Sequence, residues 1–247
     1  MIKQEELLWK LDWDTLIVLD ACRYDYFENE FYTNPCDGVL SKVYSPQSQT
    51  YKWLPHMFPY KYDIDIYSAH PGINSKGIAR NGGSWVANEH FNKIEDIWDY
   101  GWDNDLGTVH PTVVGVKVVD DILKGDYGSK NIIWFMQPHF PWIGEGYPRA
   151  KAEFVNDKRT NKEIWADLVG GKFSVDLVRE AYSANVEVVW DTVQDMLPLL
   201  DGQKVVVTAD HGELLGEYPH RPMKKQFGHW PEMETPELRE VPWLEMG

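Results

Sequence analysis

The stretch VVVTADHGELLGE, residues 205–217, places a short apolar run directly before Asp210, His211 and Glu213. A run of β-branched residues such as 205–208 is typical of a strand that is buried on both faces of a sheet. An acid and an imidazole that directly follow such a strand fit either a polar loop or a divalent metal site. The choice between these depends on whether similar residues follow the other strands.

Strands and helices alternate along the chain. Buried or short strands are predicted at 15–19, 40–44, 131–136, 204–208 and 241–246, and the stretch 62–71 alternates as a strand does and then ends in a loop. Helices are predicted over 3–11, over 111–123 with Gly125 as the stop, and over 174–197 with Ser174 as the cap. This order predicts one α/β domain over residues 1–247, with a mostly parallel sheet and helices on both faces. Residues 143–172 are polar and are predicted to form an irregular insertion or lid.

The composition restricts the partners and the compartment. The 247 residues are 43% hydrophobic and carry a net charge of −15, so we expect a folded chain that repels nucleic acid and anionic lipid. Cys22 and Cys36 form no Cys-x-x-Cys pair and indicate neither a disulfide framework nor a zinc knuckle. No signal peptide and no run of about 18 apolar residues for a membrane span is evident, so the expected location is cytoplasmic.

Polar residues of one kind follow three of the predicted buried strands. Asp20 follows the first, Gln137 and His139 follow the strand at 131–136, and Asp210 and His211 follow the strand at 204–208. An aspartate after a strand is by itself more often a helix cap, and His139 between two prolines is equally well a fixed turn residue. Because ligands bind at the carboxyl ends of strands in such sheets, the coincidence of three ends favours a metal site with oxygen and nitrogen ligands.

Several stretches that contain these residues resemble motifs of a known family. TADHGELLGE, followed by GHW and ELREVPWL, is similar to the C-terminal signature of the sulfatase-like branch of the alkaline phosphatase superfamily. IVLDACRYD resembles the first strand of that branch, whose terminal acid binds metal, and QPHFPW resembles its His-x-Pro turn. The resemblance covers residues 14–246. It implies an α/β sandwich, a divalent metal, and an enzyme nucleophile that attacks a sulfate or phosphate ester.

The nucleophile is the least certain part of the resemblance. The formylglycine motif of sulfatases is absent, because no proline follows Cys22 at the required place, and Cys22 is better explained as a small buried residue. Phosphoester members use a Ser or Thr in the stretch that matches VYSPQSQTYKWLPHMF, residues 43–58. Thr50 precedes a predicted short helix, whose positive end favours an alkoxide and a bound anion. Thr50 is therefore preferred, with Ser48 and Ser45 as alternatives and a plain helix cap as its structural role.

The resemblance and the strand ends together imply a set of metal ligands. The set is Asp20, Thr50, Asp210 and His211, for Zn, Mn, Mg or Ca. FMQPHF lacks the acid that two-metal relatives supply there, so one tightly bound metal is expected. His139 would hydrogen-bond the transferred group or protonate the leaving oxygen, and His229 would contact substrate or a weak second ion. Glu213 would orient the backbone or His211.

The substrate side contains few cations. Arg23, Lys224 and Lys225 are the candidates for binding substrate, with a structural Arg23–Asp25 pair and a solvated lysine loop as the alternatives. The leading hypothesis is a metal-dependent hydrolase of phosphate or sulfate esters, acting on a small-molecule or glycan ester through a covalent Thr50 intermediate. The alternatives are a phosphotransferase acting on a glycan or lipid-linked alcohol, and a non-catalytic ligand-binding member of the same fold. The missing formylglycine motif favours phosphate.

Overall fold

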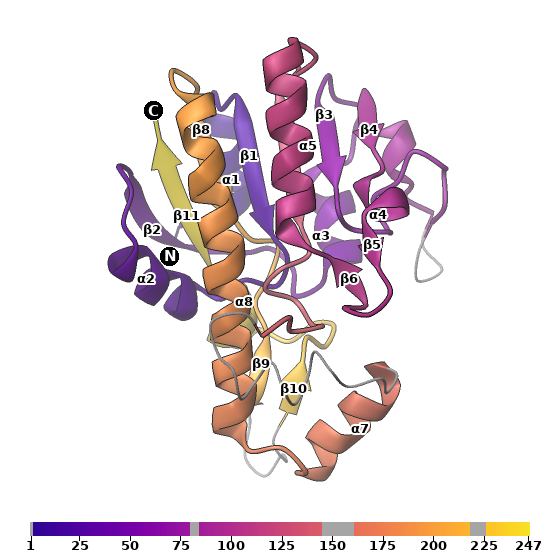
Figure 1. The fold of residues 1–247 in the computed structure, drawn as a ribbon, viewed down its shortest axis with the longest axis vertical. Coiled ribbons are helices and arrows are strands. Elements are labelled where there is room, and N and C mark those ends of the chain that lie inside the picture. The colour runs from indigo at the N-terminus through magenta and orange to yellow at the C-terminus, as the bar shows by residue number, and fades with distance from the viewer. Residues whose placement is uncertain (1, 80–83, 145–160, 218–225) are drawn as a thin grey trace.

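The computed structural model describes residues 2–79, 84–144, 161–217 and 226–247. Its main sheet has seven strands in the order β2-β11-β8-β1-β7-β3-β4. The bounds are β1 Thr15–Leu19, β2 Val39–Tyr44, β3 Asp65–Ser68, β4 Lys93–Glu95, β7 Asn131–Phe135, β8 Val205–Thr208 and β11 Glu240–Met246. Every pairing is parallel except those of β11, which runs antiparallel to both β2 and β8. The predicted mostly parallel sheet is confirmed (Figure 1).

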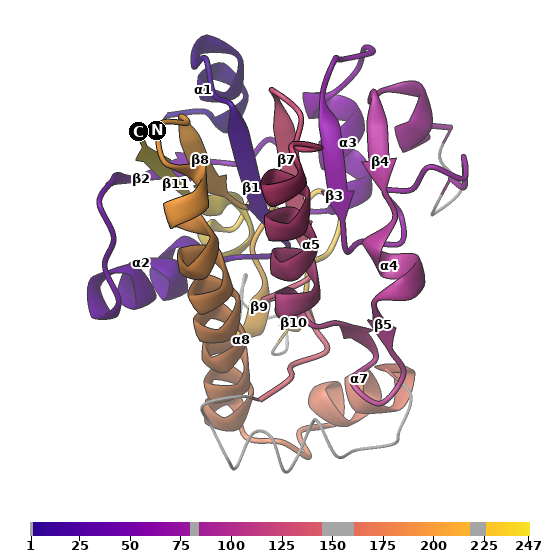
Figure 2. The same cartoon turned by 45° about the horizontal axis from the view of Figure 1, so that its top comes forward.

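Helices cover both faces of this sheet. Their bounds are α1 Gln4–Lys10, α2 Tyr24–Thr33, α3 Thr50–Met57, α4 Ile97–Tyr100, α5 Pro111–Lys124, α7 Asn161–Gly170, α8 Val175–Met196 and α9 Pro236–Arg239, with short 3₁₀ turns η1 Ala87–Glu89 and η2 Leu197–Leu200. Figure 2 shows α5 and α8 on one face and α1 and α3 on the other. Two small antiparallel pairs complete the fold, β5 Trp102–Asp103 with β6 Thr108–Val109, and β9 Leu214–Glu217 with β10 Gln226–Gly228.

Side chains of two neighbouring strands show how the layers pack. Trp134 of β7 meets Trp53 of α3 edge to face, with ring centroids 5.6 Å apart. Tyr67 of β3 pairs with Ile133 of β7 in register, so Tyr67 points to the face opposite Trp134. There its hydroxyl donates to Asp121 of α5 at 2.9 Å. Trp134 therefore packs α3 against one face of the sheet, and Tyr67 anchors α5 to the other.

The predicted helix limits are confirmed by their caps. Ser174 Oγ accepts from Leu177 N at 3.1 Å at the start of α8. Gly125 ends α5 with a φ of 75°, a left-handed conformation that glycine adopts without a steric penalty. The predicted irregular segment 143–172 is wrong in part, because α7 forms within it, and its residues 145–160 lie outside the described ranges. A lid role for this segment stays a prediction. Among the described helices, none is long and apolar enough to cross a membrane.

Candidate metal centre

The carboxyl ends of three neighbouring parallel strands bring the candidate residues together. Asp20 directly follows β1, Asp210 and His211 follow β8, and His139 lies just beyond β7. Because β1 pairs in parallel with both β7 and β8, these ends meet at one edge of the sheet. The backbone N–H of Ala21 donates to Asp210 Oδ1 at 3.1 Å and so ties the turn after β1 to the end of β8.

A first cluster consists of Asp20, Asp210 and His211. Their ligand atoms all lie within 4.8 Å of one another, and all three side chains are buried. Thr50 adjoins them: its hydroxyl donates to Asp210 Oδ2 at 2.6 Å and lies 3.3 Å from His211 Nε2. The structure thus gathers all four ligands expected from the sequence.

The charges of this cluster fit a divalent cation. Burial, and then the nearby Asp210 carboxylate, raise the pKa of Asp20 well above its ordinary value. Burial also raises the pKa of Asp210 to about 6, although hydrogen bonds from Thr50 and two backbone amides lower it. In addition, Asp20 Oδ1 is buried without a hydrogen-bond partner among the described residues. Two buried carboxylates so close together call for a positive charge between them, which a divalent ion supplies.

Backbone contacts fix which imidazole nitrogens can bind metal. His211 Nδ1 donates to Gly212 O at 2.8 Å, and His139 Nδ1 donates to Phe140 O. Because a carbonyl only accepts, Nε2 of each neutral ring carries a lone pair and is ready to coordinate an ion. His70 has the opposite tautomer, because its Nδ1 accepts from Gly72 N at 2.9 Å. Its Nε2, 3.9 Å from Asp20 Oδ2, therefore carries a proton and is not a metal ligand.

A second cluster consists of His139, Glu213 and His229, again with ligand atoms within 4.8 Å of one another. His229 Nδ1 lies 3.3 Å from the Glu213 carboxylate. Burial opposes the charged form of His229, but Glu213 outweighs it and raises the pKa of His229. Burial and the neighbouring His229 lower the pKa of His139 to about 4, so His139 is neutral at pH 7.

The role expected for Glu213 needs correction. The sequence predicted a residue that orients the backbone or His211, whereas the carboxylate contacts His229. The antiparallel pair β9–β10 explains this, because Gly228 pairs with Leu214 and so brings the next residue, His229, beside Glu213. A carboxylate therefore stands in the second cluster despite its absence from FMQPHF. To predict this contact from the sequence, LLGE, residues 214–217, would have had to be recognised as a strand that pairs with the segment before His229.

The alternative nucleophiles lie differently from Thr50. Ser45 Oγ donates to the backbone oxygens of Asp210 and Gln47, and Ser48 Oγ donates to Trp230 O at 2.8 Å. Of the three hydroxyls, that of Thr50 alone contacts a carboxylate of the cluster. The capping role considered for Thr50 is wrong, because Gln49 is the N-cap of α3 and Thr50 is its first residue. Cys22 is buried beneath the site, where burial and the Asp25 and Asp210 carboxylates raise the pKa of its thiol well above the ordinary value.

Arg23, the one predicted cation within the described residues, is engaged in ion pairs away from the two clusters. Arg23 pairs with Asp25 and with Glu217, each at 2.7 Å, and so joins the start of α2 to the end of β9. Burial lowers its pKa, but these partners outweigh burial and raise it. The structural Arg23–Asp25 alternative is therefore the one the structure shows. Lys224 and Lys225 lie outside the described residues.

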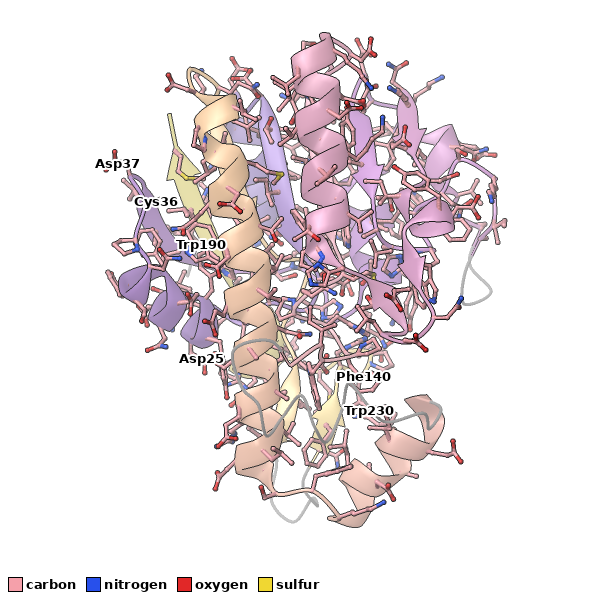
Figure 3. All side chains as sticks on the ribbon, viewed as in Figure 1. Asp25, Cys36, Asp37, Phe140, Trp190 and Trp230 are labelled. Atoms are coloured by element: carbon pink, nitrogen blue, oxygen red, sulfur yellow. The ribbon has the colours of Figure 1, made fainter. Side chains whose placement is uncertain are left out.

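A cavity of about 580 Å³ opens over both clusters. The described residues that line it are Asp20, Gln49, Thr50, Tyr51, Leu54, His70, Gly72, Trp85, His139 and His229. Figure 3 shows Phe140 and Trp230 between the lower end of the sheet and α7.

Gln4 supports the site from below, and no sequence pattern indicated it. Its fully buried side-chain amide donates to Ala209 O at 2.7 Å and to Thr208 Oγ1 at 2.9 Å. Its oxygen accepts from Trp53 Nε1 at 2.8 Å. One amide thus joins α3, which carries Thr50, to the strand end that carries Asp210.

Comparison with solved structures confirms the α/β fold that the resemblance implied. The chain is similar to the C-terminal periplasmic domain of phosphoethanolamine transferase EptC from Campylobacter jejuni, with 18% identity and a TM-score of 0.58 over 94% of this chain and 78% of that chain. It is also similar to the soluble domain of lipooligosaccharide phosphoethanolamine transferase A from Neisseria meningitidis, with 16% identity and a TM-score of 0.63 over 94% and 75%.

A third similar structure is the C-terminal periplasmic domain of EcEptC from Escherichia coli in complex with Zn, with 13% identity and a TM-score of 0.51 over 94% of this chain and 71% of that chain. No family model matches the chain, and no curated protein matches its sequence. The likeness is thus one of fold.

Proposed function

We propose that this protein is a metal-dependent enzyme that cleaves phosphate esters, with Thr50 as the nucleophile. The observation that carries the proposal is the Thr50 hydroxyl, which donates to Asp210 at 2.6 Å on the wall of the cavity. Thr50 is also the first residue of α3, where the helix dipole favours a developing alkoxide and a bound phosphoryl group. The missing formylglycine motif favours phosphate over sulfate.

The two clusters are suited to two divalent ions. Held by Asp20, Asp210 and His211, and by His139, Glu213 and His229, such ions would lower the pKa of the Thr50 hydroxyl and offset the charge on the phosphoryl oxygens. The solved Zn complex of a similar domain supports zinc as the first ion to test.

The chain's own residues position the reaction. Asp210 accepts the Thr50 hydrogen bond and so directs the remaining lone pairs of Oγ1 away from the carboxylate. Thr50 Oγ1 gives up its proton to solvent as it attacks, the Oγ1–phosphorus bond forms and the bond to the leaving oxygen breaks, and the leaving oxygen takes a proton from solvent. The phosphoryl group then passes from Thr50 to an acceptor, and the Oγ1–phosphorus bond breaks. Water as the acceptor gives hydrolysis, and an alcohol as the acceptor gives transfer. The likeness to phosphoethanolamine transferases supports an alcohol as the second candidate acceptor.

The test compares wild type with Thr50→Ala and Asp210→Asn, each with added Zn or Mn. The substrates are p-nitrophenyl phosphate, bis(p-nitrophenyl) phosphate and p-nitrophenyl sulfate, with and without glycerol as the acceptor. We expect turnover of a phosphate ester by wild type alone, and a phosphorylated Thr50 in intact-mass spectra of quenched samples. Equal rates for the three proteins would overturn the proposal and leave a ligand-binding role.

A further inference from the structure

The cavity over the clusters is lined by residues of two chemical kinds. The nucleophile and ionisable residues of the two clusters are one kind. The other kind is the apolar and aromatic side chains of Tyr51, Leu54 and Trp85, none of which belongs to either metal cluster. The cavity of about 580 Å³ falls within the usual range for sites that bury a small organic ligand, which is far more than a phosphoryl group fills. The remaining space therefore belongs to the group that is esterified to phosphorus.

Two of the apolar lining residues lie next to the nucleophile. Tyr51 directly follows Thr50 in α3, and Leu54 lies four residues after Thr50, a rise of about 6 Å along the helix. A substrate phosphoryl group at Thr50 thus places its first attached group, rather than a distant tail, against these side chains. Tyr51 is 38% exposed, which leaves ring surface for a ligand.

Trp85, which also lines the cavity, is held in place by two contacts. Its Nε1 donates to Phe58 O at 3.1 Å. One face of the indole stacks on His90, with ring centroids 4.7 Å apart and planes at 19°. The ring therefore meets the cavity with its other face or an edge, and little side-chain entropy is lost when a ligand packs on it.

We infer that Tyr51, Leu54 and Trp85 form a subsite for a sugar ring esterified directly to the phosphoryl group. This inference rests on the proposed function and adds the substrate class. A pyranose has an apolar face for the aromatic rings and hydroxyls around its edge. Gln49 lines the same cavity, and its Nε2 donates to His229 O. Its amide oxygen is buried and has no hydrogen-bond partner among the described residues, so it is not open to the cavity. The choice of a sugar ring over an acyl chain therefore rests on the two aromatic rings, Tyr51 and Trp85, which suit the flat apolar face of a pyranose.

The test measures binding to zinc-loaded Thr50→Ala protein, in which turnover is prevented. Calorimetric titrations compare inorganic phosphate, glucose 1-phosphate, hexyl phosphate and phosphocholine. We expect glucose 1-phosphate to bind at least about tenfold more tightly than phosphate. Adding Trp85→Leu or Tyr51→Leu should remove most of this gain and leave phosphate affinity unchanged. Trp102→Leu is the matched control, since Trp102 is a 39% exposed tryptophan that does not line the cavity.

Each other outcome counts against the inference in a different way. A larger gain for hexyl phosphate would identify a lipid chain as the occupant, and a larger gain for phosphocholine would identify a cationic head group. A sugar gain that survives both aromatic substitutions would place the ring elsewhere. If phosphate itself does not bind, the proposed function fails, and the subsite fails with it.

Discussion

The Thr50 hydroxyl donates to Asp210 Oδ2 at 2.6 Å, although 160 positions separate the two residues in the sequence. The contact joins the first residue of α3 to the segment that directly follows β8. Gln4 bridges the same two elements from beneath. The geometry of the site therefore depends on how α3 is seated against the end of β8.

Replacement of Thr50 by Ala should lower phosphoesterase activity by about a thousandfold or more, because the nucleophile is lost. Ser48→Ala should keep nearly full activity, since Ser48 Oγ contacts only the backbone of Trp230. Steady-state rates on the best aryl phosphate ester check both. If the Ser48 variant were as inactive as the Thr50 variant, the assignment of Thr50 as the nucleophile would be contradicted.

Glu213→Gln should remove one of two bound ions. The substitution takes the only carboxylate from the second cluster and leaves the first cluster intact. Elemental analysis and zinc titration should show one tight ion per chain in place of two, with the second weakened at least about tenfold. Glu217→Gln is the matched control, because Glu217 lies in the same strand but pairs with Arg23. Two tight ions in the Glu213 variant would contradict a second metal site there.

Gln4→Met should weaken zinc binding at the first cluster about tenfold, because it removes the hydrogen bonds that join α3 to the end of β8. Asn131→Leu controls for lost stability, since Asn131 is an equally buried amide at the start of β7, away from the clusters. Thermal unfolding of the metal-free proteins should show both variants destabilised, while zinc titration should show only the Gln4 variant weakened. Unchanged zinc affinity in Gln4→Met would reduce Gln4 to a purely structural role.

Asp121 should make the fold sensitive to acid. Burial alone would raise its pKa, but Lys117 at 2.6 Å and the Tyr67 hydroxyl hold it below the usual 3.8. Because the folded pKa is the lower one, the stabilisation is complete above the unfolded pKa and is lost as the pH falls through the folded value. Asp121→Asn should cost about 2 kcal/mol at pH 7 and progressively less below about pH 5.

Urea denaturation of wild type and Asp121→Asn across this pH range checks that difference. A gap between the two curves that stays constant as the pH falls would show that ionisation of Asp121 does not contribute.

The sequence predicted the residues that follow buried strands, and it did so for a physical reason. Runs such as TLIVL and VVVT are typical of central strands, and parallel strands bring their carboxyl ends to one edge of the sheet, so Asp20 and Asp210 were expected to lie near each other. The partner of Glu213 could not be predicted in this way. It depends on the register of a short hairpin whose strands carry little periodicity.

Arg23 and Gln4 illustrate the same limit for side chains. A basic residue near a motif is equally compatible with substrate binding and with an ion pair, and only the position of Glu217 decides between them. Gln4 lies in an amphipathic helix at a position where a polar residue would ordinarily face solvent, and its burial follows from tertiary contacts alone.

The antiparallel strand β11 also determines when the site can form. It starts at residue 240, yet it lies between β2, which starts at residue 39, and β8. Chain entropy delays such distant pairings during refolding, so the edge that carries Asp210 is completed late. Zinc should therefore slow unfolding and leave the refolding rate nearly unchanged, which stopped-flow experiments with and without the ion can measure. Faster refolding with zinc would mean that the ligands assemble before the sheet closes.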